Sequence, residues 1–173
     1  HQSDGSVVVS TNQVIKPVGT HVEFRGRPNA VVLSPDLKHA AFLNGTYKAI
    51  IVLDITTGTV KQEFDAAGSS ASFSGIVYSK DGKKLYASQA NGRIIIANVA
   101  ADGTLALDQL VATPKSLIPN PRRGAGEGNS YPGGLALSDD GSTLYVVLSR
   151  NNSLAVLDLA TRQFVAEIEV GNA

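Results

Sequence analysis

The stretch Gly75-Ile-Val-Tyr-Ser-Lys-Asp-Gly-Lys83 decides how the chain folds, because two similar stretches flank it in the sequence. These copies read Ala30-Val-Val-Leu-Ser-Pro-Asp-Leu-Lys38 and Gly134-Leu-Ala-Leu-Ser-Asp-Asp-Gly-Ser142. Their shared serines lie 45 and 59 residues apart, at Ser34, Ser79 and Ser138. Similarity that recurs every ~40–45 residues, with about four short strands per unit, is typical of β-propeller blades. The sequence therefore predicts an all-β fold with four-stranded antiparallel blades.

The middle copy shows all four strands of one predicted blade. Short turn sequences separate its apolar runs, at Asp81-Gly82, Asn91-Gly92 and Asp102-Gly103. Asn-Gly between two apolar runs is the strongest short signal of a β-hairpin, and glycine readily adopts the positive φ that such turns need. The predicted strands of this copy are 75–79, 85–88, 93–99 and 105–111.

The other two copies have the same organisation. The first runs over residues 29–64 and the third over residues 133–170, each with turn residues at matching places. Residues 50–53 and 154–157 are apolar without alternation, which is typical of strands that are covered on both faces. No stretch has a helical period. The continuous apolar runs thus favour sheets that are stacked against one another.

Composition excludes several classes of function. The chain has 15 basic and 15 acidic residues, so we expect no nucleic-acid surface and no anionic-membrane surface. It has no cysteine, which excludes disulfides and thiolate chemistry, and no apolar run of the roughly 18–20 residues that a membrane span needs. The polar start His1-Gln-Ser-Asp-Gly-Ser lacks an initiating Met and is typical of a trimmed, exported protein. We therefore expect a periplasmic or extracellular location.

The third copy resembles the YVTN-repeat family of seven-bladed-type β-propellers. The residues that carry the resemblance are Leu144-Tyr-Val-Val147, Leu154-Ala-Val-Leu-Asp158 and Ile168-Glu-Val-Gly171. The first copy departs from the pattern, with Leu37 where the turn glycine belongs and Ala40-Ala-Phe42 where the tyrosine strand belongs. The resemblance implies a propeller fold. It also implies relatives of several kinds, including surface-layer and periplasmic propellers, lactonase-like enzymes and propellers linked to a phosphoesterase domain.

The chain is too short for a closed ring, which takes about 4–8 blades. Residues 6–19 match the end of a repeat, so we expect two outer strands of a closing blade there. The predicted segments are outer strands at 6–19, blades at 27–70, 71–111 and 131–173, and an inserted loop at 112–130. We expect a piece of a longer propeller, completed by the remainder of the ring or by a second chain. The alternatives are an open three-blade arc that buries its ends against a partner, and a misread repeat count.

The inserted loop is the main candidate for a binding site. It lengthens one blade connection by about 14 residues, and long insertions on a compact repeat are often functional. Arginine guanidinium groups suit phosphate and carboxylate, so the loop predicts a site for an anionic small molecule or a peptide. The candidate residues are Arg27, Arg122, Arg123, Glu127, Asn129 and Tyr131. The alternative, which the residues themselves favour, is a solvated loop or one that packs against another domain.

Other motifs predict structure and not chemistry. Gly124-Ala-Gly-Glu-Gly128 lacks the spacing and the following helix of a dinucleotide loop. Asp139-Asp140-Gly141 lacks the spaced oxygens of a calcium loop, and its recurrence in the repeats marks a turn. The three histidines, His1, His21 and His39, have no metal-ligand spacing, and no nucleophile elbow occurs. We therefore expect no cofactor, no metal and no catalytic residue in this chain.

Together these observations predict a non-enzymatic β-propeller module for binding or scaffolding. The alternative is the propeller portion of a hydrolase, lactonase-like or phosphoesterase-linked, in which the catalytic groups lie outside this chain.

Overall fold

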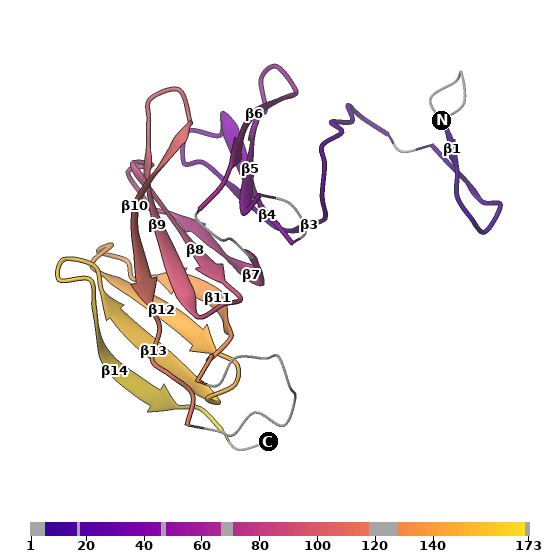
Figure 1. Cartoon of the computed structure of the whole chain (residues 1–173). Helices are drawn as coiled ribbons and strands as arrows, with labels where there is room; N and C mark the ends of the chain where they lie inside the picture. Colours follow the sequence, from indigo (N-terminus) through magenta and orange to yellow (C-terminus); the bar gives the residue numbers. More distant parts are fainter. Residues whose placement is uncertain (1–5, 17, 46–47, 67–70, 118–127, 172–173) are drawn as a thin grey trace.

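The computed structural model describes residues 6–16, 18–45, 48–66, 71–117 and 128–171, and every regular element in these ranges is a β-strand. The strands form three four-stranded antiparallel sheets and one two-stranded hairpin (Figure 1). In each large sheet the strands follow one another in chain order, as in a meander. The prediction of an all-β fold with four-stranded antiparallel blades is confirmed.

The three sheets are called blades 1 to 3 in chain order. Blade 1 consists of β3 (Pro28–Leu33), β4 (His39–Asn44), β5 (Ile50–Asp54) and β6 (Thr59–Phe64). Blade 2 consists of β7 (Ala71–Tyr78), β8 (Lys84–Gln89), β9 (Arg93–Val99) and β10 (Leu105–Ala112). Blade 3 consists of β11 (Pro132–Leu137), β12 (Thr143–Leu148), β13 (Ser153–Asp158) and β14 (Gln163–Glu169).

The repeated Ser-x-Asp sequence builds the turn between the first and second strands of each blade. In blade 2 the hydroxyl of Ser79 donates to Asp81 Oδ1 at 2.6 Å, and the same oxygen accepts the backbone N–H of Lys83 at 3.0 Å. Ser79 Oγ also accepts the N–H of Lys84 at 2.9 Å. The other two blades repeat all three bonds at distances within 0.1 Å of these. The bonds to Asp81 lower the pKa of its carboxyl group, and they show that Asp81 stabilises the turn.

The turn keeps its conformation in blade 1 although its glycine is missing. Leu37 has a φ of 59°, close to the 70° of Gly82 and the 72° of Gly141 at the same repeat position. A left-handed conformation costs an L-residue roughly 1–2 kcal/mol. The serine and aspartate bonds of the turn therefore hold Leu37 in a conformation that its own side chain disfavours.

The inner strands of neighbouring blades lie side by side, with β7 between β3 and β11. The approach of β7 to β11 is so close that a Cβ built on Gly75 would overlap the carbonyl oxygen of Gly133 and the hydroxyl of Ser88. That hydroxyl donates to the same carbonyl at 2.7 Å and also contacts the Ser72 hydroxyl. Only glycine fits at residue 75 without a shift of backbone atoms.

Two apolar cores fill the spaces between consecutive blades. The core between blades 1 and 2 includes Leu43, Ile50, Val52, Phe64, Tyr78, Leu85 and Ile95. The core between blades 2 and 3 includes Tyr86, Ile94, Ile96, Val111, Leu144, Val146 and Leu157. Each blade of a consecutive pair thus covers one apolar face of the other, which explains why the third strands are apolar without alternation.

Polar side chains join the outer parts of the blades. The amide of Gln62 on β6 bonds to both backbone groups of Leu105 on β10, donating to its oxygen at 2.9 Å and accepting its N–H at 2.6 Å. Between blades 2 and 3, the carboxylate of Asp108 accepts Lys84 Nζ and Arg162 Nη2, both at 2.8 Å. These two cations lower the pKa of Asp108, the bond from Lys84 contributing most.

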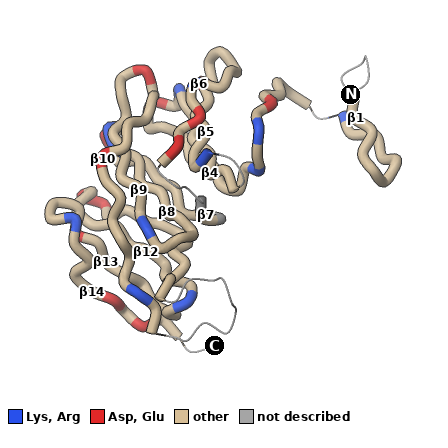
Figure 2. The backbone as a smooth tube through the Cα atoms, in the orientation of Figure 1, with Lys and Arg blue, Asp and Glu red and all other residues tan. Residues whose placement is uncertain are grey.

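The N-terminal strands β1 (Val7–Val8) and β2 (Val14–Ile15) pair with each other and stand apart from the three blades (Figure 1). The segment that follows returns to blade 1, where the Phe24 ring lies 5.9 Å from the Phe42 ring between centroids. Basic and acidic residues both occur on all three blades (Figure 2). In the described part of the chain no helix is long and apolar enough to cross a membrane.

Candidate functional site

The connections between blades and the turns between second and third strands lie on one face of the chain, here called the connection face. In each blade this turn is hydrogen-bonded to a segment that enters or leaves a blade. Gly45 N donates to Arg27 O and Thr113 N to Gly92 O, both at 3.0 Å, and Arg150 N donates to Ser130 O at 3.1 Å. These bonds place the base of the inserted loop beside the turns of blades 2 and 3.

Three of the six predicted site residues lie in the described part of the chain. Asn129 donates from Nδ2 to the Ala90 carbonyl at 2.7 Å and accepts the Tyr131 N–H at 2.9 Å, so backbone groups engage both ends of its amide. Tyr131 is half-buried with a φ of 49°. Arg27 is exposed, one connection away. The other three, Arg122, Arg123 and Glu127, lie outside the described residues, and their assignment to a site stays a prediction.

The ends of the segment that contains these three residues are joined. Ser116 N donates to Gly128 O at 2.9 Å, and a buried bond of 2.7 Å links the hydroxyls of Thr113 and Ser130. Ser116 itself borders a cavity of about 740 Å³ on the connection face. The predicted binding loop therefore leaves and re-enters the fold beside a cavity.

This cavity is lined mainly by polar side chains, among them the carboxylates of Glu167 and Glu169. Glu167 Oε1 accepts Asn151 Nδ2 at 2.8 Å and Ser153 Oγ at 2.6 Å, which fixes the carboxylate against the wall. Asn151 Oδ1 is buried and has no hydrogen-bond partner in the described ranges. Glu169 and Lys115 complete the charged lining. A positive charge in the cavity is attracted by the carboxylates of Glu167 and Glu169.

Two amide side chains that were not predicted as functional hold the segments that precede blades 1 and 2. Asn44 and Gln89 occupy the same repeat position, at the end of the second strand, and both are buried. Asn44 donates to Arg25 O at 3.0 Å and accepts the Arg27 N–H at 2.7 Å, while Gln89 donates to Ala66 O at 3.1 Å. The sequence signal that could have identified them is an amide side chain at the same repeat position in two of the three copies; the third copy has Leu148 there.

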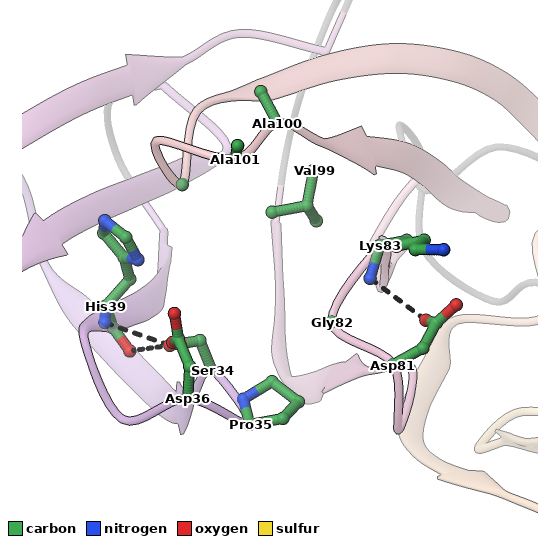
Figure 3. A pocket seen from close by; sticks show the side chains of 11 residues that line it. Ser34, Pro35, Asp36, His39, Asp81, Gly82, Lys83, Val99, Ala100 and Ala101 are labelled. Carbon is green, nitrogen blue, oxygen red and sulfur yellow. Dashed lines mark hydrogen bonds between the residues drawn. The ribbon is translucent and has the colours of Figure 1, made fainter.

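A second hollow lies on the opposite face, between the turns of blades 1 and 2 (Figure 3). It has a volume of about 460 Å³, and the side chain of Val99 projects between the two turns that bear Asp36 and Asp81. Both carboxylates are already engaged by their own turns. The His39 ring packs so tightly on Gly103 that a Cβ there would overlap it. Turn formation and packing thus account for these side chains.

The next blade junction differs from this one in having a lysine across it. Between blades 2 and 3, Lys80 reaches across to the carboxylate of Asp139 at 3.2 Å and also contacts its carbonyl. Pro35 occupies the position of Lys80 in blade 1, so no lysine spans the earlier junction there. Among the described residues, no group of three or more His, Asp or Glu could hold a metal ion.

No family model matches this chain, and no curated protein matches it. Solved structures do match. A protein of unknown function from Desulfotomaculum acetoxidans DSM 771 has a TM-score of 0.67 and 18% identity over 94% of this chain and 49% of its own. The β-propeller domain of Cps50 (Swd1) from Myceliophteria thermophila has a TM-score of 0.62 and 14% identity, over 84% of this chain and 44% of its own. A 6-phosphogluconolactonase-like protein of Bacteroides uniformis ATCC 8492 has a TM-score of 0.62 and 23% identity, over 83% of this chain and 40% of its own.

These likenesses define the class of the chain through its fold. At such identities they show a β-propeller architecture and carry no activity or ligand across. The chain spans less than half of the length of each of these three structures. The chain is thus a β-propeller module of three described blades and one described hairpin, while membership in the YVTN-repeat family is not shown.

Proposed function

We propose that this chain is a non-enzymatic binding module within a larger β-propeller, and that its ligand is a peptide held on the connection face. The observation that carries the proposal is the polar cavity of about 740 Å³, bordered by Glu167 and Glu169, beside the inserted loop. Cavities of this size accommodate several side chains or a small ligand. In this proposal a remainder of the ring, or a second chain, completes the propeller, and the protein has an exported location.

The proposed peptide carries a basic residue for the cavity. Its ammonium or guanidinium group meets Glu167 and Glu169 in the cavity. Because Asn151 and Ser153 already fix Glu167, little conformational entropy is lost when the ligand binds. An acidic residue of the peptide, next to its basic residue, pairs with Lys115, Arg122 and Arg123. The two arginines then bind an anionic group, as the sequence predicts.

The test selects peptides from a random displayed library on the immobilised chain and measures their affinities by titration. We expect selected peptides to contain Lys or Arg next to Asp or Glu. Glu167→Gln retains the bonds to Asn151 and Ser153 but removes the charge, and it should weaken binding about 10–100-fold, as expected for one charged hydrogen bond. Glu63→Gln on the outer strand of blade 1 is the matched control and should change nothing.

A double variant tests the loop in the same assay. Arg122→Ala with Arg123→Ala should weaken peptides with acidic residues and leave the unfolding transition unchanged. If the selected peptides bind wild type, Glu167→Gln and the double arginine variant with equal affinity, the connection face is not the site.

The second candidate is the propeller portion of a hydrolase, a class that also uses this fold, as the 6-phosphogluconolactonase-like protein illustrates. It predicts hydrolysis of 6-phosphogluconolactone only when the remainder of the ring is present. Turnover by the complete protein, with loss of that turnover in variants of the connection face, would favour the enzyme over the binding module.

A further inference from the structure

The hollow between the turns of blades 1 and 2, here called the turn-face hollow, has walls from two neighbouring blades of this chain (Figure 3). Its volume of about 460 Å³ is within the range of small-ligand sites. Both blades contribute apolar surface to it, through Pro35, Val99, Ala100 and Ala101. The turns and their packing explain how the polar side chains of the lining are held, but they leave two of these side chains incompletely bonded.

Asp36 is the first of these side chains. Its Oδ1 accepts the Ser34 hydroxyl at 2.6 Å and the Lys38 N–H at 3.1 Å, and no donor of the described residues bonds to its Oδ2. The Asp36 carboxylate points into the space between His39 and Val99 (Figure 3). The turn therefore fixes a carboxylate at the hollow and leaves one of its oxygens available to a ligand.

His39 is the second of these side chains. It is 8% exposed, and its ring borders the hollow. Its backbone N–H is bonded to Ser34 Oγ at 3.0 Å, but within the described ranges neither ring nitrogen has a hydrogen-bond partner. A neutral imidazole offers one donor and one acceptor nitrogen. A nearly buried polar side chain thus lies unbonded beside the Asp36 carboxylate.

The next junction shows which group can be held between two turns on this face. There Lys80 of blade 2 crosses to blade 3, where its ammonium group lies 3.2 Å from the Asp139 carboxylate and contacts the Asp139 carbonyl. Pro35 occupies the repeat position of Lys80 in blade 1. Lys83 also borders the hollow, but its side chain extends away from His39 (Figure 3). The chain therefore holds a lysine across one junction and leaves the other open.

We propose that the turn-face hollow is a second binding site, which takes a lysine side chain of a partner protein. The ammonium group donates to Asp36 Oδ2 and to a ring nitrogen of His39, and its aliphatic stem covers Val99. The carboxylates of Asp36 and Asp81 disfavour an anionic ligand. The site lies on the face opposite the cavity of Glu167, and it does not depend on the proposed peptide there.

Titration of the chain with a blocked lysine, N-acetyl-lysine methylamide, tests the site by nuclear magnetic resonance. We expect saturable shifts of the His39 ring signal and of the backbone amide signals of Lys38 and Gly103, which surround the hollow. The chain has three histidines, so His39→Gln identifies the ring signal. N-acetyl-norleucine methylamide has a four-carbon side chain without the ammonium group, and it should shift none of these signals.

Two matched aspartate variants test the role of the carboxylate. Asp36→Asn keeps an oxygen for the two turn bonds but removes the charge and replaces Oδ2 with an NH₂ group. It should weaken binding of the blocked lysine about 10-fold or more. Asp140→Asn is the control, because Asp140 makes the same two turn bonds in blade 3 and does not border the hollow. Its affinity for the blocked lysine should equal that of wild type.

Glu167→Gln separates this site from the cavity on the connection face. It should leave the response of the His39, Lys38 and Gly103 signals unchanged, whether or not the proposed peptide binds at Glu167. The absence of saturable shifts, or equal shifts with the norleucine compound, overturns the proposal. An equal loss of affinity in Asp36→Asn and Asp140→Asn also overturns it, because the lysine would then respond only to the net charge of the chain.

Discussion

Replacing Gly75 with alanine should destabilise the chain by about 3 kcal/mol. The methyl group would overlap the Gly133 carbonyl oxygen, which belongs to the backbone and cannot rotate away, and the Ser88 hydroxyl, which is held by that carbonyl. Strands β7 and β11 must therefore separate. Overpacking of this kind costs about 1–3 kcal/mol. Loss of the buried Ser88–Gly133 bond adds about 1–3 kcal/mol, while alanine recovers about 0.4–1 kcal/mol by restricting the unfolded chain.

Gly134→Ala is the matched control, because Gly134 occupies the same repeat position one blade later. A Cβ there meets only Val147 Cγ2, at an ordinary contact distance of 3.9 Å. Alanine should thus be neutral or stabilising by up to about 1 kcal/mol. Urea unfolding, followed by far-ultraviolet circular dichroism and by tyrosine fluorescence, measures both variants. Equal midpoints for the two variants would refute the close approach of β7 to β11.

Three further predictions concern polar groups. Burial raises the pKa of Tyr78 to about 12, and the Tyr78 hydroxyl has no hydrogen-bond partner in the described ranges. Tyr78→Phe should therefore raise the free energy of unfolding by about 1 kcal/mol. A urea midpoint below that of wild type would contradict this. Asp108→Asn removes the negative charge shared by Lys84 and Arg162 and should cost about 1–2 kcal/mol in urea unfolding at low salt, with a smaller loss at high salt. Hydrogen bonds from the Ser138 hydroxyl and from Ser142 lower the pKa of Asp140 from 3.8 to about 2, so the stabilising contribution of the Asp140 carboxylate is complete above pH 3.8 and is lost as pH falls toward 2. Asp140→Asn should therefore flatten the fall of the urea midpoint with pH in that range, and an unchanged slope would exclude this turn as its source.

Much of the fold was predictable because the turns are encoded locally. Asn91-Gly92 and Asp81-Gly82 gave the strand limits of blade 2 to within a few residues, and both glycines have positive φ in the structure. Leu37 shows the limit of this approach, since no propensity scale places leucine in a left-handed turn. The turn was still predicted there because the other two copies supplied its pattern.

The site was less predictable because it depends on distances between blades. The cavity joins Lys115 to Glu167, more than fifty positions later in the chain, and no local pattern in the sequence relates them. Asn129 was selected as a polar residue in a long loop, but the structure shows its amide bonded to backbone groups. Gly75 and Gly134 are equivalent in the repeat, yet in the part of the chain that the structure describes only Gly75 lies against the backbone of the following blade.

The amide of Gln62 has a consequence for strand addition. β10 is the outermost strand of blade 2, and such an edge offers free backbone groups on which a foreign β-strand can assemble into an aggregate. At Leu105 these groups are taken by one side chain, which donates to the oxygen and accepts the N–H as a strand would. An incoming strand must first displace Gln62, so this part of the edge is protected from templated aggregation by a single glutamine.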